Sequence, residues 1–146
     1  MSEVHAVIGI EQMKKLPSFL DERKENFLSL EDSLSGLDGF SILPQPIDKT
    51  RTSSHYCMGI LLESKLTDKR PEIMDRLKSR GIGTSIYYPH PVPHMSYYRD
   101  KYGIIDCPNA ELISNSIIAL PVGPHLNADD MQNIGDGLAK ALSEIN

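Results

Sequence analysis

The chain has 146 residues, of which 40% are hydrophobic and 24% are charged, and its formal net charge is −5. This length suits one domain, 1–146, with a sizeable core, and the composition is typical of soluble globular proteins. The negative charge without a basic stripe argues against nucleic-acid binding, and no apolar run reaches the ~20 residues that a membrane span needs.

The N-terminal residues predict a helix that begins at a Ser2 cap, and they show no signal-peptide pattern. The apolar side chains of this helix spread over more than one of its faces, and they are Val4, Val7, Ile8, Ile10 and Met13. Such a helix is stable when more than one face is buried. A lone domain of this size buries one face, so we expect a homodimer through the N-terminal helix.

Pro17 is expected to end this helix and to open a second one, because proline suits a first turn and disrupts a helix interior. The second helix is expected to end at Gly36, where glycine adopts the conformation that stops a helix. Arg23, Lys24 and Glu25 are expected to point outward from it, opposite its apolar stripe.

Four short strands are expected, at 40–43, 56–62, 82–88 and 117–120. The strand at 56–62 is apolar at nearly every position, which is typical of a strand covered on both faces. His55 precedes this strand, and we expect its side chain to have satisfied hydrogen bonds. Cys57 and Cys107 lie far apart without CxxC spacing, so we expect reduced cysteines in a cytoplasmic protein.

Helices are expected between these strands and after them. Asp68 is expected to cap the helix before the third strand, a short helix at 95–102 precedes Gly103, and Pro108 opens another. Asn127 is expected to cap the last helix. The whole pattern predicts an α+β fold, a two-layer sandwich of about four short mixed or antiparallel strands with helices packed on one face.

The segment 81–103 contains five of the six tyrosines and a loop stiffened by prolines. These prolines hold the preceding residues extended, so His90 and His94 lack the helical turn that would bring them onto one metal ion, and no metal site is expected. Either the loop presents its side chains to a ligand, or its tyrosines pack in the core. The chain contains no dinucleotide loop, phosphate loop or nucleophile elbow, so its residues alone give no catalytic set.

Several pieces of the sequence, taken together, resemble one enzyme family in order and spacing. They are the segments 1–16, 22–24, 81–103, 108–111 and 119–127, including the run Tyr-Tyr-Pro-His-Pro-Val-Pro-His at 87–94. Over its whole length the chain is similar to the C-terminal, small domain of the DegT/DnrJ/EryC1/StrS family of pyridoxal-phosphate (PLP)-dependent sugar aminotransferases. That resemblance implies the small domain of a fold-type I PLP enzyme.

The resemblance also implies what this sequence does not contain. In the family, the Schiff-base lysine and the phosphate-binding residues belong to a large domain, and no lysine here matches the catalytic one. PLP is therefore expected in the complete enzyme and not on this chain alone, which has no catalytic residue. The chain is expected to be a partial reading frame or one half of a split enzyme with a separate large-domain chain.

Three residues carry the expected contact with the substrate. In the family, the loop that matches 88–94 approaches the sugar, so the resemblance implies that Tyr88, His90 and His94 bind a nucleotide sugar. Hydroxyl and imidazole groups both donate and accept hydrogen bonds, which suits a sugar. His94 has a simpler alternative role as the cap of the following helix. A free-standing, non-enzymatic sugar- or partner-binding module is the alternative function, and a dehydratase on the same fold also stays open.

Overall fold

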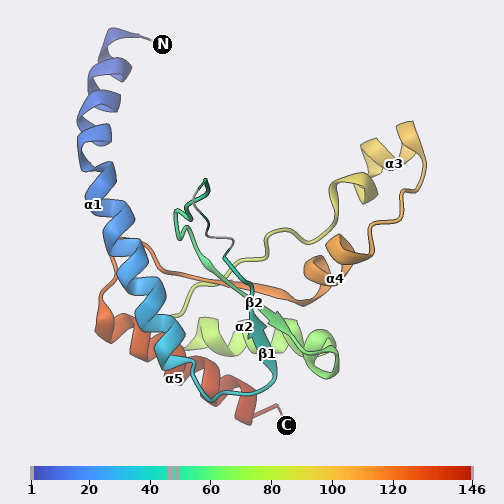
Figure 1. The fold of residues 1–146 in the computed structure, drawn as a ribbon. Helices are drawn as coiled ribbons and strands as arrows, with labels where there is room; N and C mark the ends of the chain where they lie inside the picture. The colour runs from blue at the N-terminus through green and yellow to red at the C-terminus, as the bar shows by residue number, and fades with distance from the viewer. Residues whose placement is uncertain (1, 46–47, 49, 146) are drawn as a thin grey trace.

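The computed structural model describes residues 2–45, 48 and 50–145 (Figure 1). The helices are α1 (Glu3–Ser33), α2 (Arg70–Ser79), α3 (Ser96–Tyr102), α4 (Pro108–Ser116) and α5 (Ala128–Ser143). The strands are β1 (Phe40–Ile42), β2 (Met58–Leu62) and β3 (Ile117–Leu120), and the 3-10 helices are η1 (Ser64–Lys69) and η2 (Val92–His94). The α+β class expected from the sequence is confirmed.

β2 is the central strand of an antiparallel sheet with the order β1-β2-β3. Phe40 of β1 pairs with Leu62, and Ile60 of β2 pairs with Ile118 of β3. β2 and β3 are buried almost throughout, as their continuous apolar runs predict. α2 and α5 lie on one side of the sheet, whereas the N-terminal half of α1 and the segment with α3 and α4 extend away on the other (Figure 1).

The strand expected at 82–88 does not form, and this prediction is wrong. Within the described residues this segment contributes one isolated bridge, in which Ser85 N lies 3.2 Å from Ala119 O and Ala119 N lies 2.8 Å from Ser85 O. Ile82 is buried against α5, where a Cβ on Gly137 would lie 2.3 Å from its Cδ1. The apolar pattern of this segment therefore reflects burial of single side chains and not ladder pairing, a known ambiguity of short apolar runs.

The break expected at Pro17 is also wrong, because Pro17 lies inside the continuous helix α1. A proline in a helix removes the hydrogen bond from its own nitrogen to the carbonyl four residues earlier, here that of Met13. Its fixed φ is itself close to the helical value, so a helix with good formers on both sides can continue through it. One long helix thus joins the exposed N-terminal segment to the core.

The C-terminal half of α1 packs against α5. Leu30 has no exposed surface and belongs to the same core cluster as Met131 and Leu138 of α5. The Ser33 hydroxyl donates across the contact, with Oγ 2.8 Å from Leu30 O and 3.3 Å from Met131 O. Gly135 permits this approach, because a Cβ there would lie 2.5 Å from Ser33 Oγ and 3.1 Å from Ser33 O. The two helices are therefore in close backbone contact.

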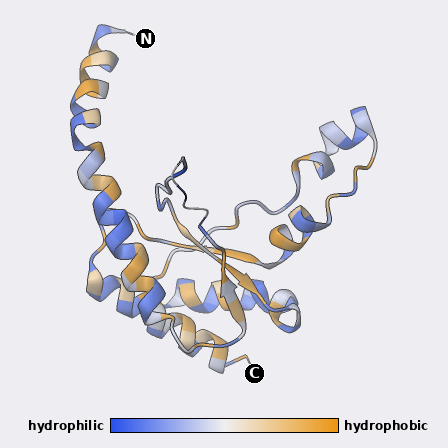
Figure 2. Ribbon diagram, in the orientation of Figure 1, coloured by the Kyte–Doolittle hydropathy of each residue, from blue (hydrophilic) through white to orange (hydrophobic). Residues whose placement is uncertain are grey.

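The N-terminal half of α1 is exposed, and hydrophobic and hydrophilic residues alternate along this part of the ribbon (Figure 2). The members of this apolar surface are Val4, Val7, Ile8, Ile10 and Met13. The buried residues of the helix all lie in its second half, and they are Asn26, Phe27 and Leu30. The N-terminal half of α1 thus carries several uncovered apolar side chains on one element.

Local signals place most helix ends as expected. Asn127 caps α5 in a capping box, because its side chain accepts from Asp130 N and the Asp130 carboxylate accepts from Asn127 N. Gly103 ends α3 with φ of +79°, and Pro108 opens α4. Asp68, however, lies inside η1 and does not cap α2. The 3-10 turn ahead of α2 already occupies the place where a capping residue would stand.

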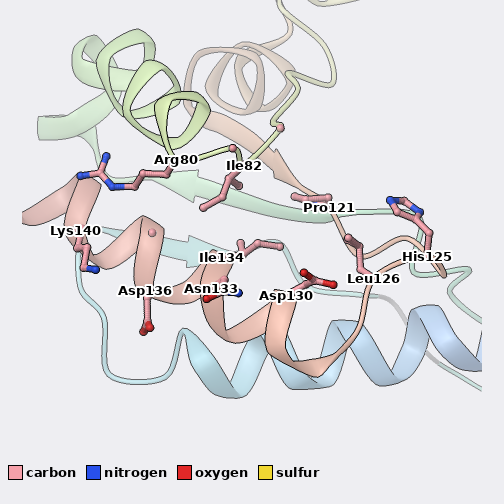
Figure 3. A pocket seen from close by; sticks show the side chains of 13 residues that line it. Arg80, Ile82, Pro121, His125, Leu126, Asp130, Asn133, Ile134, Asp136 and Lys140 are labelled. Atoms are coloured by element: carbon pink, nitrogen blue, oxygen red, sulfur yellow. The ribbon is translucent and has the colours of Figure 1, made fainter.

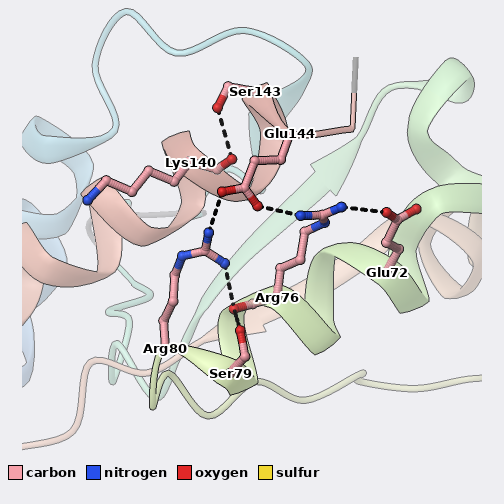
Figure 4. Close-up of polar contacts among 7 residues, drawn as sticks. All are labelled: Glu72, Arg76, Ser79, Arg80, Lys140, Ser143 and Glu144. Atoms are coloured by element: carbon pink, nitrogen blue, oxygen red, sulfur yellow. Dashed lines mark hydrogen bonds and ion pairs between the residues drawn. The ribbon is translucent and has the colours of Figure 1, made fainter.

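Ion pairs join the C-terminal ends of α2 and α5 (Figure 4). Glu144 accepts from Arg80, with Nη2 2.6 Å from Oε1, and also pairs with Arg76, which in turn binds Glu72 at 2.8 Å. The hydrogen bonds from Arg80 and Arg76 lower the pKa of Glu144.

Within the described residues no helix is both long and apolar enough to cross a membrane.

His55 is buried, and its hydrogen bonding differs from the prediction. It has a positive φ of 45°, and its ring packs 4.9 Å from the Phe27 ring. Its Nδ1 is buried without a hydrogen-bond partner among the described residues. Burial, followed by the charge of Lys24, lowers the pKa of His55, while Glu31 opposes the shift. The imidazole thus packs on Phe27, and its Nδ1 has no hydrogen-bond partner there among the described residues.

The buried imidazole predicts a pH dependence of stability. The unfolded chain binds this proton near 6.5, whereas the folded chain binds it only at lower pH, so the free energy of unfolding should fall as the pH is lowered below 6.5. His55→Asn keeps a residue that tolerates positive φ and should flatten that slope. Urea unfolding at about pH 7.5 and about pH 5.5 checks this, with the exposed His125→Asn as control. An unchanged slope in His55→Asn would contradict this assignment.

Candidate functional site

Three tyrosine rings, those of Tyr56, Tyr87 and Tyr88, form a row between the start of β2 and the loop that precedes η2. The Tyr56 and Tyr87 ring centroids lie 6.2 Å apart, and those of Tyr87 and Tyr88 lie 5.4 Å apart. The peptide bond between Tyr87 and Tyr88 is cis. The Arg23 guanidinium carbon lies 5.5 Å from the centroid of the Tyr56 ring, within the range of a cation–π contact. The row therefore joins α1, the start of β2 and the loop.

The first cavity at this row, which we call the loop cavity, has a volume of about 360 Å³ and lies between the loop and α4. Its polar groups come from Tyr87, Tyr88, His90 and Ser114, and its apolar wall includes Val92, Met95 and Ile113. Tyr88 is 66% exposed, and His90 is exposed as well. Apolar walls with a few convergent polar groups are typical of small-molecule sites. The structure thus brings two of the three expected substrate residues, Tyr88 and His90, into one cavity.

His94 lies elsewhere. Its Nε2 is 2.8 Å from Ile105 O and 3.5 Å from a carboxylate oxygen of Glu111, and it does not line the loop cavity. The N-cap of α3 is Met95, which has no side-chain cap bond, so His94 does not cap this helix either. Instead, His94 ties η2 to the connection between α3 and α4.

The second cavity, which we call the arginine cavity, has a volume of about 300 Å³ and lies between α1 and the connection after β3. Its polar side chains are those of Arg23, Tyr56, Cys57, Ser85, Tyr87 and His125. Tyr87 lines both cavities and thus forms the wall between them. Tyr87, through a hydrogen bond and its charge, raises the pKa of Tyr56, and Arg23 opposes the shift.

Asn26 fixes the far wall of the arginine cavity. It is 94% buried, and its Nδ2 donates to Gly123 O at 3.0 Å and to Leu126 O at 3.1 Å. These two bonds hold the connection between β3 and α5 against α1, one turn of α1 from Arg23. The cavity wall is therefore part of the packed body of the molecule and not a free loop.

Sequence reasoning missed the arginine cavity. It placed Arg23 on an outward helix face, but the residue is partly covered, and its Nε is buried without a hydrogen-bond partner in the part of the chain that the structure describes. Helical periodicity places Arg23 relative to its own helix, and the covering group, Tyr56, comes from a residue far along the chain. The adjacent tyrosines at 87 and 88 were the signal in the sequence for this part of the site, although only Tyr88 was predicted to bind substrate.

Comparison with known proteins now gives the family. The sequence profile described as the DegT/DnrJ/EryC1/StrS aminotransferase family matches residues 1–139. The chain belongs to this family. Its relatives include the dTDP-4-dehydro-2,3,6-trideoxy-D-glucose 4-aminotransferase of Saccharopolyspora spinosa, which is 29% identical over 97% of this chain and 34% of the relative. The resemblance stated from the motifs alone is thus confirmed.

Solved structures of family members agree with the fold. Helicobacter pylori PseC, an aminotransferase of pseudaminic acid biosynthesis, superposes with a TM-score of 0.89 at 26% identity, over 99% of this chain and 38% of PseC. The PLP-form of Spr1654 from Streptococcus pneumoniae, described as a sugar aminotransferase, superposes with a TM-score of 0.86 at 21% identity, over 100% of this chain and 37% of that one. At the latter identity the likeness speaks for the fold alone. This family member spans little more than a third of the length of these relatives.

The lysines of this family member do not provide a PLP site. A Schiff-base lysine needs a lowered pKa, which burial or a neighbouring cation supplies, and a cradle for the cofactor. Every lysine for which the structure gives a position is exposed, and Lys14 and Lys65 pair with Glu11 and Glu63. Likewise, no cluster of three or more metal-binding side chains occurs in the part of the chain that is described. The residues present therefore do not fit PLP by themselves.

Proposed function

We propose that this chain is the small-domain part of a PLP-dependent nucleotide-sugar aminotransferase and that it contacts the sugar without being catalytic alone. The observation that carries the proposal is the loop cavity, which gathers Tyr88 and His90 in a chain whose residues 1–139 match a sugar aminotransferase family. The names and titles of the relatives support the same substrate class, since they include enzymes that act on dTDP- and UDP-linked sugars.

In this proposal the side chains of the loop cavity bind and orient the sugar. The Tyr88 hydroxyl and the His90 imidazole exchange hydrogen bonds with sugar hydroxyls. Val92, Met95 and Ile113 cover the apolar face of the ring and exclude water from it. His94 positions the loop indirectly, through its bond to Ile105 O. When bound in the complete enzyme, PLP supplies the electron sink for amino transfer.

The exposed half of α1 is the surface through which we propose that this chain binds its protein partners. In a protein of the relatives' length, a large domain, in the same or a separate chain, would cover this apolar surface. In the absence of that domain we propose that two copies of the chain pair through it as a homodimer. The two arrangements compete for the same surface, so a chain that binds a large domain here should not dimerise through it at the same time.

The proposal predicts that this chain forms no stoichiometric Schiff base with PLP. The reason is that the described lysines are exposed and have no cofactor cradle. The purified chain is mixed with PLP, reduced with borohydride, digested and mapped by mass spectrometry. Scattered, substoichiometric labelling of several lysines is the expected result. Stoichiometric labelling of a single lysine would show a cofactor site on this chain and would overturn the non-catalytic assignment.

A further inference from the structure

Arg23 is a cation without an anionic partner among the described residues. Its guanidinium forms neither an ion pair nor a hydrogen bond with any residue in the described part of the chain, and its buried Nε lacks a partner as well. Among the residues that the structure describes, its guanidinium contacts the Tyr56 ring, in a cation–π interaction. A guanidinium carries five N–H donors, and a buried donor without an acceptor is destabilising. A positive group held this way on a packed helix is suited to accept an anion from outside.

The surroundings of Arg23 favour the same conclusion. The arginine cavity contains no aspartate or glutamate in its lining, and besides Arg23 its polar side chains are Tyr56, Ser85, Tyr87, His125 and Cys57. Hydroxyl groups at three of these positions can donate to a bound oxygen. The acid next to Arg23 in sequence, Glu22, accepts from Ser18 Oγ at 2.7 Å and lines, with Glu25, a different hollow.

The larger groove beside it provides a contrast (Figure 3). This groove of about 660 Å³ lies between the end of α2 and α5 and is lined by two cations, Arg80 and Lys140, and by two carboxylates, Asp130 and Asp136. Arg80 already binds Glu144 at 2.6 Å. The cations of the larger groove are therefore balanced by its carboxylates, whereas Arg23 in the arginine cavity has no carboxylate beside it in the lining. The two hollows adjoin, because His125 and Pro121 line both.

We propose that the arginine cavity is an oxyanion site, in which Arg23 binds a carboxylate or a phosphate group and the hydroxyls of Ser85 and Tyr87 complete its coordination. Arginine is suited to this role because its planar fork binds both groups through two parallel hydrogen bonds. The cation–π contact with Tyr56, at 5.5 Å from the ring centroid, restrains the guanidinium in advance, which reduces the entropy lost on binding.

The source of the oxyanion is a separate question, and its answer rests on the proposed function. Both substrates of a nucleotide-sugar aminotransferase carry such a group, the nucleotide as a phosphate and an amino-acid donor as a carboxylate. Tyr87 separates the arginine cavity from the loop cavity, so one ligand that reaches past Tyr87 could place its sugar in one and its anion in the other. The site itself is defined by the chemistry of this chain and can be tested with simple anions.

The test follows the Arg23 side chain directly. The chain is labelled with ¹⁵N for NMR, and the Arg23 Nε–H signal is assigned by its loss in Arg23→Lys. Inorganic phosphate, L-glutamate and uridine diphosphate are then titrated separately at constant ionic strength. We expect the signal to shift saturably, and Arg23→Gln to weaken binding about tenfold or more, as measured by calorimetry. Arg23→Lys, which retains the charge without the fork, should weaken it less. Arg99→Gln is the matched control, because Arg99 lies on exposed α3 beside Asp100.

Each outcome decides one point. Tighter binding of uridine diphosphate identifies phosphate as the ligand group, and tighter binding of glutamate identifies carboxylate. No saturable shift at tens of millimolar of any probe, or equal loss in Arg99→Gln and Arg23→Gln, would overturn the site. Urea unfolding of each variant verifies its fold, and the wild-type shift remains decisive if Arg23→Gln does not fold. No cofactor or sugar enters this test, so its failure and the failure of the proposed function are distinguishable.

Discussion

Leu30→Ala is expected to lower the free energy of unfolding by about 2–5 kcal/mol. Leu30 has no exposed surface and belongs to the core cluster that joins α1 to α5. The cost has two parts, the lost free energy of transferring the removed methyl groups from water into the core and the free energy of the cavity that they leave. This cavity cannot collapse easily, because Gly135 already brings α5 into close contact with Ser33 of α1. We therefore expect a value in the upper half of that range.

Leu28→Ala is the matched control. It removes the same atoms from the same helix two residues earlier, but Leu28 is 52% exposed. Its expected cost is below about 0.5 kcal/mol, as for most surface substitutions away from special features. Urea unfolding followed by circular dichroism measures both variants. Equal losses in the two would mean that the C-terminal half of α1 does not pack on α5 as described.

Ile8→Asp is expected to convert a dimer of the isolated chain into a monomer. Burial of an aliphatic side chain stabilises by roughly 1.5–3 kcal/mol, and several such side chains lie on the exposed half of α1. Two or three of them would favour association by several kcal/mol before the entropic cost of association is subtracted. An aspartate at position 8 would place a charge in that interface, where it lacks a partner and opposes burial.

Sedimentation equilibrium over a concentration series measures this effect. Leu112→Asp is the matched control, because Leu112 is a similarly exposed apolar residue on α4, outside the proposed interface. We expect wild type and Leu112→Asp to dimerise and Ile8→Asp to remain monomeric. A wild-type chain that is monomeric at high concentration, with no change in Ile8→Asp, would rule out the homodimer.

The sequence predicted those parts of the fold that depend on local signals. The Asn127 cap, the stop at Gly103 and the start at Pro108 need only neighbouring residues, and all are present. The local signal at Asp68 was the exception, and two further errors occurred where longer-range packing decides. Whether a helix continues through Pro17 depends on what stabilises both sides of it, and whether 82–88 pairs as a strand depends on the partner edge of β3.

The candidate site divides in the same way. Tyr88 and His90 are two residues apart on a stiff loop, so their common cavity could be inferred from the chain itself. Arg23 and Tyr56 meet only because α1 packs beside the start of β2, which no pattern within either segment indicates. His94 has the residue type expected of a sugar contact, but its ring nitrogen is bound to Ile105 O, eleven residues onward.

The most direct test of the proposed function joins this chain to the part of a relative that it does not match. The Helicobacter pylori UDP-4-amino-4,6-dideoxy-N-acetyl-β-L-altrosamine transaminase is 26% identical over 99% of this chain and 38% of its own length. This chain replaces that matched segment, and amino transfer is measured with the UDP-amino sugar for which the transaminase is named. The shortened transaminase without the segment is the negative control, and the PLP absorbance of the joined protein verifies that it is folded and loaded.

We expect the joined protein to catalyse amino transfer and the shortened transaminase not to. The Tyr88→Phe, His90→Gln double variant should lower kcat/KM by about 10- to 100-fold, because two hydrogen bonds to the sugar are lost. His94→Gln, outside the loop cavity, should retain more activity than the double variant. A folded, PLP-loaded joined protein without amino transfer, or one whose kcat/KM the double variant leaves unchanged, would contradict the proposal that this chain supplies the sugar-contacting part of the enzyme.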